Sequence, residues 1–318
     1  YLAQGPYNQA LGLWYAGEKF SPEAKADVEA KVATMIDVYK SRLQTADWLA
    51  PETREKAITK LNVITPHIGY PEKLPETYDK KIIDENLSLV ENAQKLVEIS
   101  VAHSWSKWNQ PVDRSEWHMP AHMVNAYYDP QQNQIVFPAA ILQAPFYDLH
   151  QSSSANYGGI GAVIAHEISH AFDTNGASFD ENGSLKNWWT EEDYAAFKER
   201  TDKIVDQFEG LDSYGAKVNG KLTVSENVAD LGGVACALEA AKRDKDFSVR
   251  EFFVNFATIW RMKAREEYMQ MLASVDVHAP AKWRTNVIVS NFDEFHKEFD
   301  VKEGDGMWRA PEDRVIIW

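Results

Sequence analysis

The sequence predicts a mostly α-helical protein with a small β component. Apolar residues recur at helical spacing over most of the chain, which favours amphipathic helices. Only two short runs near the middle are rich in β-branched and aromatic residues, as is typical of strands. The chain has 318 residues, of which 44% are apolar and 25% charged. This is a normal globular composition, and the length allows one large domain or two ordinary ones.

The first part of the chain, residues 1–80, is expected to be helical. Ser21 and Pro22 are typical of a helix start, because a Ser side chain caps the first turn and Pro fits within it. Pro51 begins a second helix in the same way. A third long helical stretch is expected over residues 84–108, where apolar residues again follow helical spacing.

Three prolines interrupt this helical pattern, and such breaks indicate a boundary: Pro66, Pro71 and Pro75. We therefore expect a division of the chain near residue 85. Residues 1–85 would form a helical segment, and residues 86–318 would form the larger unit.

The strand-like runs at 124–128 and 134–138 are expected to pair as a hairpin, because Asp129-Pro130 between them is a turn signal. A glycine-rich entry at 157–161 precedes an apolar helix, and the glycines there allow close packing. Further helices are expected over 190–209, 224–243 and 249–273, with short helices and turns from 281 to 318.

The overall composition excludes several classes of protein. Lys and Arg number 33 and Asp and Glu 48, so the net charge is −15, which is unsuited to binding nucleic acid phosphates. The single cysteine, Cys236, cannot form an intrachain disulfide. No apolar run approaches the roughly 20 residues that a membrane span needs, and no signal peptide is visible. We expect a cytoplasmic bacterial protein, with a secreted or cell-surface location left open.

The motif H-E-x-x-H, at His166-Glu167-Ile168-Ser169-His170, carries the strongest chemical signal. Two His residues four positions apart lie on one face of a helix, so both imidazoles can bind one zinc ion. Glu167 then lies within reach of a metal-bound water and can act as its general base. The alternative is a chance match, which the apolar residues flanking the motif make less favourable.

A zinc site of this kind needs a third protein ligand, and no His follows at the spacing typical of the metzincins. Glu226 and Asp230 lie four residues apart on another expected helix, among apolar neighbours. Glu226 can bind the metal, and Asp230 can hold a ligand imidazole by its other nitrogen. Asp173 is a second residue that can orient an imidazole. The alternatives are a solvated acidic face for the first two and a turn or cap role for Asp173.

Taken together, these motifs resemble the neprilysin-like (M13) zinc endopeptidases. Other stretches share the resemblance: Val124-Asn125-Ala126-Tyr127-Tyr128, Asn133 to Ala139, Asn156 to Gly161, Val277-His278-Ala279-Pro280 and the final Trp318. The match covers nearly the whole chain and is strongest from about residue 111 to 318. Bacterial oligopeptidases of the PepO type are the most similar members, because one cysteine does not fit the disulfide-rich animal ectoenzymes.

The resemblance implies a thermolysin-like zincin catalytic lobe over 86–318 and part of a helical cap lobe over 1–85. It implies one zinc ion (Zn²⁺) per chain, Glu167 as the base, and these ligands: His166, His170 and Glu226. Asp173 and Asp230 match the acids that orient the ligand imidazoles, and Asp230 counts among the catalytic residues for that reason.

Other matching positions would contact the substrate. Asn125 and Ala126 match residues that bind the peptide backbone, and Arg284 matches one that grips a substrate carbonyl. His278 matches a residue that stabilises the transition state, although a surface His in a loop is the alternative. The family's S1′ pocket would be lined by Ile141, Phe146, Val163, Ile259 and Trp260, for which a purely structural role in the core is the alternative.

These inferences predict a zinc-dependent endopeptidase that hydrolyses small peptides on the amino side of hydrophobic residues. Zinc-activated water would be the nucleophile and Glu167 its general base. A catalytically inactive, zinc-holding binding module is the alternative, which an intact Glu167 argues against. The resemblance covers about the C-terminal half of the family's usual chain. We therefore expect a partner besides the peptide substrate, either an N-terminal companion chain or the missing N-terminal half of the same protein.

Overall fold

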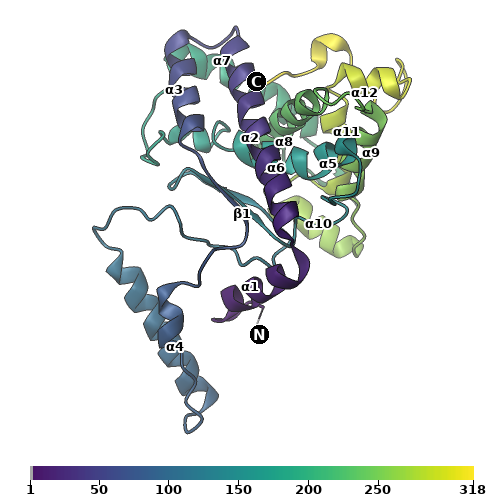
Figure 1. Ribbon diagram of the computed structural model, residues 1–318. Helices are drawn as coiled ribbons and strands as arrows, with labels where there is room; N and C mark the ends of the chain where they lie inside the picture. Colours follow the sequence, from purple (N-terminus) through teal and green to yellow (C-terminus); the bar gives the residue numbers. More distant parts are fainter. Residues whose placement is uncertain (1–2) are drawn as a thin grey trace.

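A computed structural model describes residues 3–318 and shows a mostly helical chain with little strand, which confirms the predicted fold class (Figure 1). The first half contains α1 (Asn8–Lys19), α2 (Pro22–Thr45), α3 (Pro51–Asn62), β1 (Thr65–Gly69), the 3-10 turn η1 (Glu76–Lys80), α4 (Leu89–Ser106), β2 (Tyr127–Asp129), β3 (Gln134–Pro138) and α5 (Ser153–Asn156).

The second half begins with a π-helical turn, η2 (Tyr157–Gly161), that runs directly into α6 (Ala162–Ser169). It continues with η3 (Gly176–Ser178), α7 (Glu191–Phe208), β4 (Asp212–Ser213), β5 (Ala216–Lys217), α8 (Gly220–Ala241), α9 (Val249–Ile259), α10 (Glu266–Val275), α11 (Ala281–Val289), α12 (Asp293–Glu298) and η4 (Pro311–Asp313).

The helix starts predicted at Ser21-Pro22 and at Pro51 are confirmed, and Pro51 is the first residue of α3. Ser21 Oγ accepts a hydrogen bond from the Ala24 amide at 3.2 Å, and Pro22 is the first residue of α2. The helix predicted over 84–108 is shorter, because α4 begins only at Leu89, where Ser88 and Glu91 form a reciprocal capping box. The apolar face of α2 is buried, including Met35 and Tyr39, while its opposite face is exposed, so this long helix packs along the side of the core (Figure 1).

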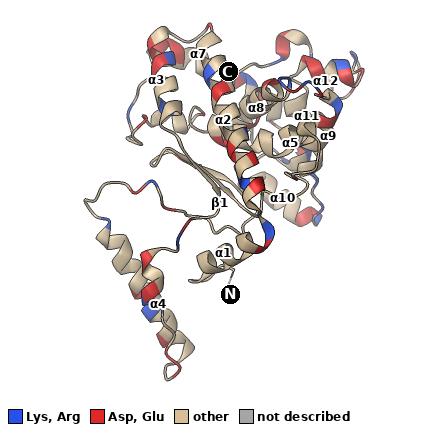
Figure 2. Ribbon diagram, viewed as in Figure 1, with Lys and Arg blue, Asp and Glu red and all other residues tan. Residues whose placement is uncertain are grey.

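A three-stranded sheet lies beside α2, in the order β1-β3-β2. The predicted hairpin of β2 and β3 is present and antiparallel. The sequence did not predict β1, which pairs with β3 in parallel and contains Pro66. Pro lacks an amide hydrogen and is tolerated because β1 is an edge strand. The buried β3 carries no charged residue, whereas charged residues gather on outer helices such as α3 and α12 (Figure 2).

The helices α6 and α8 pack against each other at the centre of the second half, and α2 packs on both. Gly233 of α8 makes this approach possible, since a Cβ atom there would lie 2.7 Å from the backbone nitrogen of His166. The close packing places the acidic residues of α8 opposite the H-E-x-x-H motif of α6.

The helix predicted over 249–273 is wrong in one respect, because the structure divides it into α9 and α10. Residues 260–265 are not helical, and all the side chains from 261 to 265 are exposed. Burial of an apolar face stabilises most helices in proteins, and this stretch buries none. The break turns α10 toward the pocket described below.

The expected division at residue 85 does not coincide with a gap in the core. Residues of α2, α3 and β1 belong to the same hydrophobic cluster as those of α6 and α8, so the domain division stays a prediction. Among the helices of residues 3–318, α4 stands away from the others (Figure 1). Among residues 3–318, no helix combines the length and apolar character needed to cross a membrane.

Candidate active site

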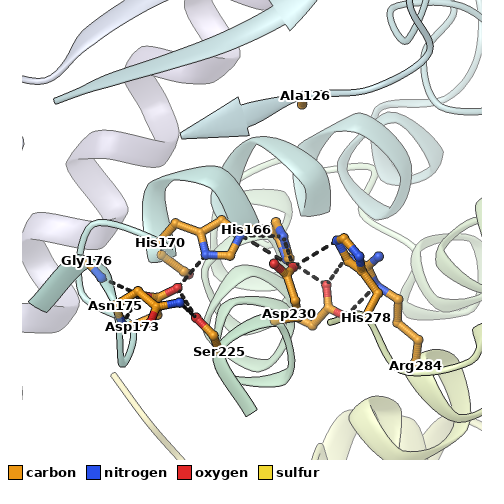
Figure 3. Close-up of polar contacts among 12 residues, drawn as sticks. Ala126, His166, His170, Asp173, Asn175, Gly176, Ser225, Asp230, His278 and Arg284 are labelled. Carbon is orange, nitrogen blue, oxygen red and sulfur yellow. Dashed lines mark hydrogen bonds and ion pairs between the residues drawn. The ribbon is translucent and has the colours of Figure 1, made fainter. Parts of the chain in front are cut away.

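The end of α6 brings the imidazoles of His166 and His170 together (Figure 3). His166 lies in the helix and His170 directly follows its last residue. The Nε2 atoms of the two rings are 3.0 Å apart. Glu167 offers a carboxylate oxygen within 4.8 Å of both rings, and it is 6% exposed.

The third predicted ligand reaches the same point from α8. Glu226 Oε2 lies 3.2 Å from His166 Nε2 and 3.5 Å from His170 Nε2. This oxygen is buried and accepts no well-formed hydrogen bond. The two helices α6 and α8 therefore direct two nitrogens and one oxygen at one another.

The opposite ring nitrogens are held by carboxylates, as the sequence predicts for Asp173 and Asp230. His170 Nδ1 lies 2.6 Å from Asp173 Oδ2, and His166 Nδ1 lies 2.7 Å from Asp230 Oδ1. A neutral imidazole that carries its proton on Nδ1 presents a lone pair at Nε2. Two such lone pairs and the Glu226 carboxylate then converge without a donor between them, an arrangement that a cation stabilises.

The donor set fits zinc. Ligand atoms at 2.0–2.1 Å from a tetrahedral zinc ion lie about 3.3 Å from one another, close to the separations of 3.0–3.5 Å observed here. Two imidazoles and one carboxylate are the protein ligands of a catalytic zinc site that leaves the fourth position open. His166, His170 and Glu226 are the residues that would hold the ion.

Burial controls the electrostatics around these ligands. Burial raises the pKa of Glu167, against the lowering effect of the neighbouring His166 and His170. Burial also acts to raise the pKa of Asp230, but the charges of Arg284 and His166 outweigh it and lower the pKa to about 2. These charges therefore favour the anionic form of Asp230 beside the His166 ring.

His278 reaches the site from the loop before α11. Its Nε2 lies 3.1 Å from Glu226 Oε2, and its Nδ1 lies 2.8 Å from Asp276 Oδ1. The sequence analysis overlooked Asp276. The signal was an Asp two residues before His278, a spacing that lets the carboxylate bind both the backbone amide and the ring of the His. Arg284 of α11 pairs with Asp230 and lies beside this His (Figure 3).

A pocket of about 700 Å³ opens above these groups. Of the residues expected to contact substrate, it is lined by Asn125, Ala126, Ile141, Phe146, Val163, Trp260 and Arg284. Ile259, the last residue of α9, does not line the pocket because its side chain is buried in the core, and Phe256, one turn earlier, lines the pocket in its place. The sequence analysis also overlooked the apolar wall formed by the break after α9 and by α10: Met262, Tyr268, Met269 and Leu272.

Sequence models of peptidase family M13 match residues 125–315 and residues 1–71. The chain belongs to peptidase family M13. A Streptococcus gordonii protein, named for a zinc metalloproteinase in the scaA 5′ region, is 81% identical over 252 residues, which are 79% of this chain and 45% of that protein. A neutral endopeptidase of Lactococcus lactis is 55% identical over 317 residues, covering 100% of this chain and 50% of the relative.

Solved structures confirm the zincin fold. The crystal structure of PepO from Lactobacillus rhamnosis has a TM-score of 0.94 and 42% identity, and the match covers 98% of this chain and 50% of that one. The zinc metalloprotease ZMP1 of Mycobacterium tuberculosis, in complex with an inhibitor, has a TM-score of 0.92 and 38% identity, with 100% and 50% covered. The chain thus has the fold of zinc metallopeptidases and spans about half the length of the relatives it matches.

Proposed function

We propose that this chain forms the catalytic half of a zinc endopeptidase that cleaves small peptides on the amino side of hydrophobic residues. The convergence of His166, His170 and Glu226 on one point, with Glu167 beside it, carries the proposal. The apolar pocket next to this point supports the preference for a hydrophobic side chain.

Each residue of the site has a chemical task in peptide hydrolysis. When bound, zinc supplies Lewis acidity toward water and toward the scissile carbonyl. Glu167 takes the proton of the attacking water and passes it to the leaving amine. His278, held by Asp276, donates a hydrogen bond to the oxyanion that forms on the carbonyl.

The rim of the pocket would hold the substrate backbone. Asn125 is exposed at the pocket and Ala126 lies at the start of the hairpin, so both can meet an extended peptide. Arg284 borders the same pocket and would direct a guanidinium N–H at a substrate carbonyl. Phe146 and Trp260 would then face the side chain that follows the scissile bond.

The substitution Glu167→Gln tests the proposal, because glutamine keeps the shape and removes the base. We expect zinc content at the wild-type level and a fall in kcat of about 10²–10⁴-fold for a peptide containing Phe or Leu. Wild-type hydrolysis should also stop on addition of a chelator and return with zinc. Zinc binding by the wild type without any peptide hydrolysis would favour the inactive binding module, and near-normal turnover by Glu167→Gln would refute the base.

The exposed surface of the N-terminal part supports a second proposal, that the preceding half of the protein packs against residues 1–110. Helix α4 exposes a row of apolar side chains, among them Val97, Val101 and Trp105, and its outer neighbour Trp108 is 71% exposed. Exposed apolar surface of this kind marks an interface. The relatives are about twice as long as this chain, so their other half is the natural occupant of this surface.

A cytoplasmic location of the protein remains a prediction.

A further inference from the structure

Lys60, in the last turn of α3, is a lysine without access to solvent, with an exposed fraction of 1%. It lies outside the pocket and contacts none of the three zinc ligands. Lysines are almost never fully buried unless their charge is paired. The groups that compensate for the burial of the Lys60 charge must therefore lie around its side chain.

The Lys60 ammonium donates three hydrogen bonds, all to backbone carbonyl groups of one segment. Nζ lies 2.8 Å from the Ala171 oxygen, 2.8 Å from the Gly176 oxygen and 2.7 Å from the Phe179 oxygen. An ammonium has three hydrogens, so every one of them is used. The segment, residues 171–179, starts directly after His170, and we refer to it as the 171–179 turn.

The same turn is held from its other side by Asp173. Asp173 Oδ1 accepts the amide hydrogens of Asn175 and Gly176, at 2.8 Å and 2.6 Å (Figure 3). Asp173 Oδ2 accepts from Ser225 Oγ at 2.6 Å and faces His170 Nδ1. One carboxylate thus binds the amides of the turn, and one ammonium binds its carbonyls.

The turn leaves little room for another arrangement. A Cβ atom on Gly176 would lie 1.7 Å from the carbonyl oxygen of His170, so the chain returns directly over the ligand. Any shift of the turn therefore moves either the His170 backbone or the Asp173 carboxylate.

The surroundings of Lys60 partly compensate for the burial of its charge. The rings of Tyr128, Phe172 and Trp188 lie 5.8–5.9 Å from Nζ, within the range of cation–π attraction. Burial lowers the pKa of Lys60 to about 7, while the carboxylates of the turn and the residues after it act to raise it: Asp173, Asp180 and Glu181.

We propose that Lys60 is a positioning residue of the zinc site: it fixes the 171–179 turn and thereby the Asp173 carboxylate that holds the His170 imidazole. The inference rests on the zinc site proposed above. It extends that site to α3, a helix that the sequence places more than a hundred residues earlier in the chain.

The test compares the zinc affinity of the wild type with that of the variant Lys60→Met, both made as the complete protein. Competition with a chromogenic chelator measures the affinity. Methionine keeps most of the length of the side chain and removes the charge and the donors. Loss of a group that orients a metal ligand typically weakens metal binding by about 10–100-fold, and we expect a loss of that order. Lys56→Met, at an exposed position of the same helix, is the control and should bind zinc as the wild type does.

Hydrogen–deuterium exchange of the metal-free proteins gives a second, local measurement. We expect the amides of Asn175 and Gly176 to exchange faster in Lys60→Met, while those of α8 keep their protection. A purely structural role would lower the melting temperature without this local change. Excess zinc should restore activity to the variant.

The outcomes separate this inference from the proposed function. A wild type that binds no zinc would overturn the proposed function itself. A wild type that binds zinc, with Lys60→Met binding it equally well, would overturn the role of Lys60 alone. If Lys60→Met does not fold, Lys60→Gln, which keeps two donors without the charge, decides by the same two measurements. Wild-type zinc affinity and wild-type exchange of the turn in that variant would also overturn it.

Discussion

Arg284 and Asp230 form a buried ion pair with two parallel hydrogen bonds. Arg284 Nε donates to Asp230 Oδ2 at 2.6 Å, and Nη2 donates to Oδ1 at 2.9 Å. The same Oδ1 lies 2.7 Å from His166 Nδ1, so the arginine supports the residue that orients a zinc ligand. The sequence analysis gave Arg284 only a contact with substrate, and the structure adds this second contact.

Replacing Arg284 by Met is therefore expected to affect zinc binding as well as catalysis. Breaking a buried ion pair by removing one partner costs about 3–5 kcal/mol, because the other charge is left unpaired. We expect a lower melting temperature, weaker zinc binding and a reduced kcat/KM for peptides. Arg284→Lys keeps the positive charge but cannot make both parallel hydrogen bonds, so its losses of stability, zinc affinity and kcat/KM should be smaller. Unchanged zinc affinity in Arg284→Met would limit this residue to the substrate.

The contact between Asp276 and His278 leads to a different expectation, since neither residue is a zinc ligand in the proposed site. Asp276→Asn should leave zinc content unchanged and lower kcat, because the His278 ring loses the carboxylate that orients it. Removing one oxyanion donor costs about 10²–10³-fold in kcat, so we expect a loss of up to that size. Equal kcat values for Asp276→Asn and the wild type would show that the backbone alone positions His278.

Local spacing explains which parts of this site could be predicted from the sequence. His166 and His170, like Glu226 and Asp230, lie four residues apart, and a helix places such pairs on one face whatever surrounds it. The hairpin of β2 and β3 is local for the same reason. Asp276 was within reach of this reasoning, because it lies two residues from His278.

Contacts between distant segments could not be predicted in this way. β1 pairs with a strand 69 positions later, and only the partner reveals that Pro66 lies on an edge. The carbonyl groups that bind Lys60 are 111 to 119 residues away, and no side-chain pattern marks a backbone acceptor. The break after α9 depends on the absence of a packing surface for residues 261–265, which is again a property of the fold.

Val163 offers a test of the pocket that leaves the zinc ligands intact. It lines the pocket from α6 and is 6% exposed. Val163→Phe should fill part of the pocket and shift cleavage toward peptides with a smaller residue after the scissile bond. Digestion of a peptide library, read by mass spectrometry, measures this preference, with Val163→Ile as the milder control. An unchanged profile in Val163→Phe would remove this residue from the specificity pocket.

A charged residue introduced on the apolar surface of α4 should lower the stability of the protein only when the rest of the protein is present. Val97 is 59% exposed in this chain and lines a shallow apolar groove together with Trp105. Exposed substitutions usually change stability by less than about 0.5 kcal/mol, so Val97→Asp should be nearly neutral in the isolated chain. In the complete protein it should cost more than about 1 kcal/mol, through burial of an unpaired charge. Gln94→Asp introduces the same residue at an exposed position of α4 outside this groove. Equal melting temperatures for the two variants of the complete protein would contradict the proposed docking surface.

The last prediction concerns Gly159, in the π-helical turn η2 that leads into α6. A Cβ atom at this position would lie 2.3 Å from the carbonyl oxygen of Phe146 and 2.7 Å from Asn255 Nδ2. The same carbonyl accepts the Ile160 amide at 2.7 Å, so it cannot move away without loss of that hydrogen bond. Phe146 forms one wall of the pocket, and Gly159→Ala should therefore shift that wall.

We expect Gly159→Ala to destabilise the protein by about 1–3 kcal/mol, the usual effect of overpacking, and to weaken the preference for large hydrophobic residues. Zinc affinity should change little, because the ligands lie beyond the next turn of α6. Gly306→Ala is the matched control, since no atom lies within 4 Å of a Cβ there. Thermal melting and the peptide-library profile measure both effects. A Gly159→Ala variant with wild-type stability and wild-type specificity would show that the turn accommodates the methyl group without moving the Phe146 wall of the pocket.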